Sequence, residues 1–252
     1  MTDAHKEPDL SALSADVAKK VGPFLTGIIE ARSDDFQSIY VVGSAATLEF
    51  SPDRSDFNTL FVLKEFSIDF LDFLAPMGKK FGRKRIQAPT IMTAEYINNS
   101  LDVYPVEFLQ YKRVNRLVFG EDVLKDIEIK PADLRLQIER ELKGRLIGLR
   151  QGYIASMGRR PFIRELLIDS IPGLIPLLSG LLFLLDKEIP ELKLDTIRAV
   201  SESLEIDLDP VAGALTMRRA NRKPGLIELK KMFEGIYDSL EKLARKVNDL
   251  EI

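Results

Sequence analysis

The pattern of apolar and polar residues changes near residue 130. Before that point, short β-branched runs alternate with segments in which apolar residues recur every three or four positions. Beyond it, the helical spacing continues and strand-like runs are not evident. The pattern therefore predicts an α+β chain: a small mixed β-sheet domain with flanking helices over residues 1–130, followed by an all-α helical bundle over residues 131–252.

The first half predicts a regular succession of helices and strands. Helical spacing runs from Leu10 to Ala31, with Asp9 placed to cap its start. Ser67 and Thr93 can cap two further helices, which reach about Met77 and Asn99. Extended segments are expected at residues 39–42, 56–63, 89–92 and 101–109, the last with Pro105 marking a sheet edge or a bulge.

The second half predicts a series of helices. They are expected to run from Asp133 past residue 150, and over residues 162–185, 195–204 and 210–219. Glu139 and Lys143 are spaced for an i,i+4 ion pair, as are Glu141 and Arg145. The apolar stretch 171–185 is shorter than the ~20 residues that cross a bilayer, and we expect a buried bundle helix and no membrane association.

The final helix carries an unbroken heptad pattern. Its apolar residues alternate steps of three and four between Leu226 and Leu250, and Pro224 suits a first helical turn. Two interpretations remain open. The seam can pack inside the chain's own bundle, or it can join two copies as a homodimer.

Composition removes several classes of chemistry. The chain has no cysteine and a single histidine, His5, which excludes disulfides, thiolate nucleophiles and histidine-rich metal sites. The lack of cysteine and of a secretory signal leads us to expect a cytoplasmic protein. The net charge of −3 gives no support for a nucleic-acid partner. Catalysis, if present, must use carboxylates, lysines, arginines and backbone amides.

One pair of neighbouring strands carries candidate phosphate chemistry. Gly43-Ser44 follows the apolar run that ends at Val42, and Asp56 and Asn58 open the next strand. A Gly-Ser turn lets backbone amides approach a triphosphate closely. Alternate strand positions share one face, so Asp56 and Asn58 can point at the same ligand. Carboxylates in this arrangement hold Mg²⁺, and Glu107 is the best placed third acid.

The stretch from Val42 to Val62 resembles the signature of the polymerase-β-type nucleotidyltransferase superfamily, which is a strand, Gly-Ser, a spacer, then Asp-x-Asp or Asp-x-Glu. The segments 104–112 and 117–124 are similar to the bacterial kanamycin-nucleotidyltransferase-like branch, in which a helical domain follows. The similar segments cover roughly residues 15–130.

The resemblance implies transfer of a nucleotidyl group from a nucleoside triphosphate to a hydroxyl acceptor, bound in the cleft between the domains. One or two Mg²⁺ would assist. Gly43 and Ser44 would contact the phosphates, Asp56 and Glu107 would be catalytic, and Asp56, Asn58 and Glu107 would hold metal.

Two departures from the family pattern affect this expectation. Asn58 stands where the family has an acid, and Thr47-Leu48 replaces a frequent Arg-Gly. An amide oxygen brings no charge to a metal site. The alternative is therefore a catalytically inactive nucleotide-binding or regulatory protein on the same fold.

Each candidate residue also has a structural interpretation. Glu107 could be an edge-strand charge, and Asp53 or Asp102 could replace it as the third acid. Five of the seven residues 79–85 are Lys or Arg, which could receive a triphosphate or form a solvated helix end.

Overall fold

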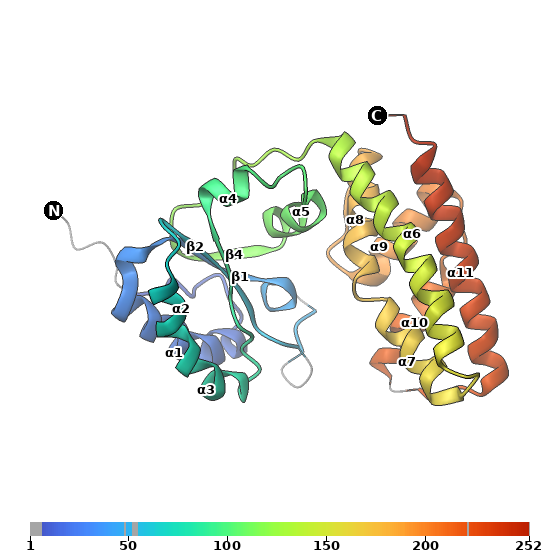
Figure 1. Cartoon of the computed structure of the whole chain (residues 1–252), viewed down its shortest axis with the longest axis horizontal. Coiled ribbons are helices and arrows are strands. Elements are labelled where there is room, and N and C mark those ends of the chain that lie inside the picture. The colour runs from blue at the N-terminus through green and yellow to red at the C-terminus, as the bar shows by residue number, and fades with distance from the viewer. Residues whose placement is uncertain (1–6, 48, 52–54, 221, 252) are drawn as a thin grey trace. The chain divides into compact units, whose positions relative to one another are not determined.

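A four-stranded sheet organises the first half of the chain in the computed structural model, which describes residues 7–47, 49–51, 55–220 and 222–251 (Figure 1). The strand order is β3-β2-β1-β4. The strands are Phe36–Val42 (β1), Asn58–Leu63 (β2), Thr90–Thr93 (β3) and Asn115–Gly120 (β4). β1 pairs antiparallel with β2 and β4, whereas β2 pairs parallel with β3. The predicted small mixed sheet is confirmed.

The helices of this half are α1 (Ala15–Arg32), α2 (Ile68–Leu74), α3 (Gly78–Gly82), α4 (Ala94–Asn98) and α5 (Pro105–Arg113). Ser67 and Thr93 cap α2 and α4 through their side-chain oxygens, as predicted. The predicted start of α1 at Asp9 is wrong, because the N-cap of this helix is Ser14. Asp9 instead accepts a hydrogen bond from the backbone of Ser11, which makes a local turn ahead of the helix.

The sheet packs one face against α1. Alternate residues of a strand point to opposite faces of the sheet. Because the register of β1 shifts between Phe36 and Ser38, Phe36 and Ile39 both belong to the core that contains the apolar stripe of α1. Val21, Leu25 and Ile28 of α1 are fully buried in this core. On the other face, the Tyr40 hydroxyl lies 3.1 Å from Asp122 Oδ1 and accepts a hydrogen bond from Leu124 N. The strand that leads into Gly43 is therefore fixed on both faces.

Residues 101–109 are not extended, which corrects our expectation. Pro105 occupies the first position of helix α5, where its missing N–H loses no intrahelical bond. Glu107 consequently lies in the first turn of a helix and not on an edge strand. The strand β4 follows α5 directly, and the sequence pattern did not predict it.

Two compact units are distinguished by the contacts within the chain. The first contains residues up to Leu101 together with Phe108–Glu128, and the second contains Asp102–Glu107 together with the residues from Ile129 onward. The division at residue 130 into separately folding domains stays a prediction.

The second unit is helical. Its helices are α6 (Pro131–Ala155), α7 (Arg160–Ser170), α8 (Leu174–Leu184), α9 (Lys193–Leu204), α10 (Asp209–Arg219) and α11 (Leu226–Asn248). The expected single helix over residues 162–185 is divided, because Ile171–Gly173 forms a turn that contains Pro172. By length and composition alone, residues 160–184 could cross a membrane. The side chains of α8 nevertheless pack in the core of this unit, as expected for a bundle helix.

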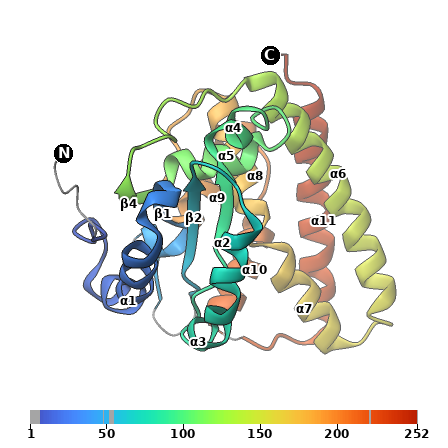
Figure 2. The ribbon, with the colours of Figure 1, turned by 60° about the vertical axis from the view of Figure 1, so that its left-hand side comes forward.

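The heptad seam of α11 faces its own bundle. Helix α11 packs against α6, α7 and α10, and it lies side by side with α6 in Figure 1 and Figure 2. The seam residues Leu229, Ile236, Leu240, Leu243 and Val247 are buried. The bundle interpretation is favoured, and a homodimer stays a prediction. Pro224 precedes the helix instead of entering its first turn, since Gly225 is the N-cap.

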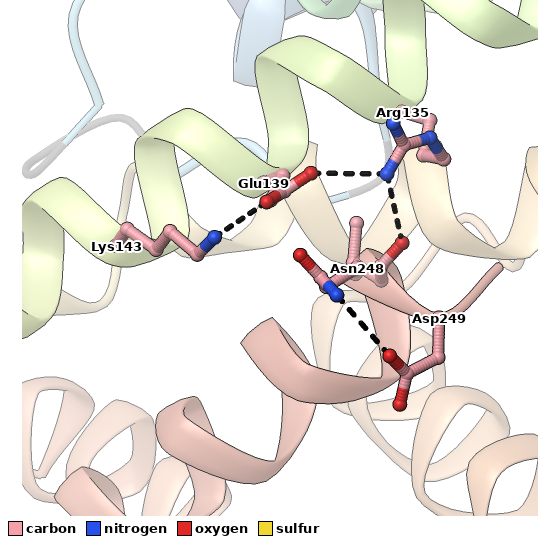
Figure 3. A network of polar contacts seen from close by, with 6 residues as sticks. Arg135, Glu139, Lys143, Asn248 and Asp249 are labelled. Carbon is pink, nitrogen blue, oxygen red and sulfur yellow. Dashed lines mark hydrogen bonds and ion pairs between the residues drawn. The ribbon is translucent and has the colours of Figure 1, made fainter.

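A polar network joins the same two helices (Figure 3). Arg135 NH1 lies 2.9 Å from Glu139 Oε2 and donates to the backbone oxygen of Val247 at 3.3 Å. Lys143 Nζ lies 2.5 Å from Glu139 Oε1, which confirms this predicted i,i+4 pair. Glu141 and Arg145 also pair, at 3.9 Å. The hydrogen bond with Lys143 lowers the pKa of Glu139 below its ordinary value.

Candidate functional site

The turn after β1 is built around Gly43. Its φ of +69° lies in the left-handed region, which a residue with a Cβ adopts only with strain. Thr47 closes the turn, because both its N–H and its hydroxyl donate to the backbone oxygen of Ser44, at 3.1 and 3.0 Å. Among the described residues, a Cβ added at Gly43 would meet Asn58 Nδ2 alone within 4 Å, at 3.5 Å. Glycine is therefore needed at this position for its backbone conformation.

Asn58 is the residue that faces this turn. It pairs with Val42 across the antiparallel ladder, at the first position of β2, and its side chain is exposed. The structure thus brings together Gly43 and Asn58, two of the residues that the sequence predicted. The adjoining Leu48 lies outside the described residues.

Asp56 precedes β2 and is paired with an arginine. The Nε–H of Arg85 donates to Asp56 Oδ1 at 3.0 Å. Both side chains are about half exposed, with relative accessibilities of 45% for Asp56 and 41% for Arg85. The Asp56 carboxylate, two residues before Asn58, therefore already has a cationic partner.

The backbone holds these two residues next to each other. Phe57 and Ile86 form a parallel bridge. Phe57 N donates to Arg85 O at 2.9 Å, and Gln87 N donates to Phe57 O at 3.0 Å. Residues 85–87 thus extend the β3 edge of the sheet alongside the segment that carries Asp56.

Arg85 has an unusual backbone conformation. It terminates α3 with a φ of +63°. Ile86 N donates to Phe81 O and Arg85 N donates to Gly82 O, which is the Schellman arrangement. Glycine is the usual residue at this position, and an arginine there costs about 1–2 kcal/mol. Strain of this kind concentrates at functional sites, so Arg85 is a candidate functional residue.

Glu107 has different neighbours. It belongs to the second unit, where its Oε2 accepts a hydrogen bond from Gln137 Nε2 at 2.8 Å. The same amide nitrogen lies 2.9 Å from Glu141 Oε1, and Gln137 Oε1 accepts from Val106 N. Within its own unit the Glu107 carboxylate is thus held by Gln137, and its role as the third acid stays a prediction.

The donor set in the described part of the chain does not fit a two-metal centre. Mg²⁺ prefers charged oxygen ligands. Asp56 offers a carboxylate already paired with a guanidinium, and Asn58 offers a neutral amide. Within residues 7–47, 49–51, 55–220 and 222–251, no group of three His, Cys, Asp or Glu side chains is arranged to hold a metal ion. Asp102 belongs to the second unit, and Asp53 lies outside the described residues.

One cavity of about 250 Å³ lies elsewhere in the first unit. Gln37, Asn98 and Asp126 contribute its polar lining. It contains none of the residues predicted for a site, and it is smaller than the ~300–1,000 Å³ typical of ligand pockets.

The mixed sheet followed by helices agrees with the fold implied by the resemblance, and the comparison with solved structures confirms it. Among solved structures, the chain is similar to spectinomycin adenyltransferase AAD(9) from Enterococcus faecialis, whose crystal structure contains ATP and spectinomycin. The TM-score is 0.51 at 16% sequence identity, over 93% of this chain and 97% of the adenyltransferase. No family model matches the sequence, and no curated protein matches it. At this identity the likeness shows the fold alone.

Sequence reasoning did not connect Arg85 with Asp56. The two residues are 29 positions apart, and the basic run 79–85 was assigned either to a phosphate or to a solvated helix end. The feature that points to Arg85 is its backbone conformation, because this arginine occupies the left-handed position that follows α3. That conformation is not readable from residue types alone.

Proposed function

We propose that this chain is a nucleotide-binding protein built on the nucleotidyltransferase fold. It holds a nucleoside triphosphate at the Gly43-Ser44 turn and transfers nucleotidyl groups weakly or not at all. The observation that carries this proposal is the composition of the site. Arg85 pairs with Asp56 at 3.0 Å, and Asn58 faces Gly43.

The turn supports the binding half of the proposal. Among the described residues, Asn58 alone lies within 4 Å of where a Cβ of Gly43 would be, and backbone amides in such left-handed turns form favourable sites for phosphate oxygens. The solved adenyltransferase with the same fold was crystallised with ATP.

The charges support the other half. Transfer of a nucleotidyl group requires stabilisation of the charge that develops on the phosphate and activation of the attacking hydroxyl. Asn58 supplies no charge and no base. Of positions 56 and 58, Asp56 supplies the carboxylate, and the positive charge of Arg85 offsets its negative charge.

Binding is tested by titrating the full chain with ATP in a calorimeter. Gly43→Ala should weaken ATP binding, because the alanine strains the turn by about 1–2 kcal/mol. Gly27→Ala is the matched control, since a Cβ at Gly27 meets nothing within 4 Å in helix α1. The absence of any ATP binding by the unmodified chain would refute the proposal.

A second candidate is nucleotidyl transfer to a hydroxyl acceptor. It is favoured by the extent of the likeness to an adenyltransferase, which covers 93% of this chain. Pyrophosphate release from ATP, measured with small polyhydroxylated acceptors such as spectinomycin, tests it. Turnover by the unmodified chain would replace the first proposal with this one.

A further inference from the structure

We propose that Arg85 takes the place of a divalent cation, so that this site binds the triphosphate without metal. The inference rests on the proposed nucleotide binding and specifies the form of ligand that the site accepts. The family that this chain resembles is expected to bind Mg²⁺ through acidic side chains. This chain instead presents an aspartate paired with an arginine, and an asparagine.

The first step is the charge of the site. Two or three carboxylates repel a triphosphate, and a divalent cation is then needed between them. Here Asn58 contributes no charge, and the positive charge of Arg85 offsets the negative charge of Asp56. A metal-free triphosphate therefore meets a site that does not repel it.

The second step is the chemistry of the guanidinium group. It carries five N–H donors in a planar fork, and this geometry matches both carboxylate and phosphate oxygens. Arg85 uses Nε on Asp56, and its side chain is 41% accessible. The Asp56 carboxylate binds one edge of the guanidinium group and thereby orients it. Carboxylates orient metal-binding histidines in the same way.

The third step is the backbone that places the group. The bridge between Phe57 and Ile86 fixes Arg85 beside Asp56. The left-handed conformation of Arg85 would be relieved by glycine, so the conformation alone does not account for an arginine there.

The experiment is ATP titration of the full chain in EDTA and, separately, in Mg²⁺. The unmodified chain should bind ATP in EDTA at least as tightly as in Mg²⁺. Arg85→Gln should weaken binding in EDTA roughly tenfold to a hundredfold, the effect of one charge-assisted hydrogen bond. Lys84→Gln, which removes the exposed cation next to Arg85 in the sequence, should change it by roughly twofold at most, the effect of a solvent-screened charge.

Two further variants separate binding from stability. Arg85→Gly should raise the Tm, since glycine suits the left-handed position, and should still lose ATP affinity. Asp56→Asn should retain or strengthen binding in EDTA, because it removes a negative charge next to the phosphates. In Mg²⁺, a metal-dependent site would instead lose ATP binding in the Asp56→Asn variant.

The outcomes distinguish this inference from the proposed function. Binding that requires Mg²⁺, that survives Arg85→Gln, or that is lost in Asp56→Asn overturns the role of Arg85 and leaves nucleotide binding intact. Failure to bind ATP in both buffers overturns both proposals.

Discussion

The hydroxyl of Tyr40 lies 3.1 Å from Asp122 Oδ1, which ties the central strand β1 to the segment that follows β4. Tyr40 is fully buried, and Leu124 N also donates to its oxygen. The sheet that presents Gly43 is thus secured by a buried phenol on the face opposite α1.

We expect Tyr40→Phe to lower the free energy of unfolding by about 0.5–1.5 kcal/mol, because it removes the hydrogen bonds of the hydroxyl, whereas Leu124 N keeps Asp122 Oδ1 as an acceptor. Urea denaturation followed by circular dichroism measures the change. Tyr96→Phe is the control, since Tyr96 is 48% exposed, and it should change stability by roughly 0.5 kcal/mol at most. Equal effects of the two substitutions would contradict the role of the Tyr40 hydroxyl.

The same residue predicts a dependence of stability on alkaline pH. Burial raises the pKa of Tyr40 above its ordinary value of 10.0. The unfolded chain therefore loses this proton first, and the stability contributed by Tyr40 is complete below pH 10.0 and declines as the pH rises through the folded-state pKa. The difference in unfolding free energy between the unmodified chain and Tyr40→Phe should shrink over that range. A constant difference would exclude a shifted phenol.

Gly120 at the end of β4 should tolerate no side chain. Its φ is +80°, and an added Cβ would lie 2.0 Å from the backbone oxygen of Gln37. Gly120→Ala should destabilise the chain by about 2–4 kcal/mol, through the left-handed penalty and the displacement of β1. Gly144→Ala in helix α6, where a Cβ meets nothing within 4 Å, should be neutral or stabilising in the same thermal melt.

The interior seam of α11 predicts a large packing effect. Leu240→Ala should lower the free energy of unfolding by about 2–5 kcal/mol, because Leu240 is 2% exposed. Ile227→Ala, on the same helix and 76% exposed, should change it by roughly 0.5 kcal/mol at most. A Tm that rises with protein concentration would show that the seam instead joins two copies.

Asn58→Asp should convert the site toward metal dependence. The added carboxylate stands two residues from Asp56 along the chain, so it should raise the ATP affinity in Mg²⁺ over that in EDTA by about tenfold. Asn99→Asp, an exposed residue in the same unit, controls for net charge. An ATP affinity of Asn58→Asp that is the same in Mg²⁺ and in EDTA would mean that position 58 does not face the phosphates.

Local sequence signals predicted much of the fold. Ser67 and Thr93 identified two helix starts because a cap depends on residues within one turn. The Gly43-Ser44 turn and the strand from Asn58 were likewise readable from neighbouring residues. Asp9 was predicted as the cap of α1 because its residue type suits that position, but the helix begins later, with Ser14 as its cap.

Long-range relationships were not readable. The segment 101–109 has apolar residues at positions compatible with a strand, but Val106 and Glu107 bond to Gln137, thirty-one and thirty residues away, in a helix. The pairing of Arg85 with Asp56 likewise depends on how β3 is placed beside β2. Such contacts depend on how distant segments of the chain are placed in the fold, and the local sequence around each residue does not determine that placement.

The turn at Ile171–Gly173 also has a consequence for biosynthesis. A nascent chain that exposes the apolar stretch 160–184 resembles a membrane span by composition. Helix α8 contains 11 residues and is therefore only about 16 Å long, well short of the ~30 Å hydrocarbon core of a bilayer. By dividing the stretch into two short helices, the turn lets the chain build a strongly apolar bundle core without offering the insertion machinery a continuous spanning helix.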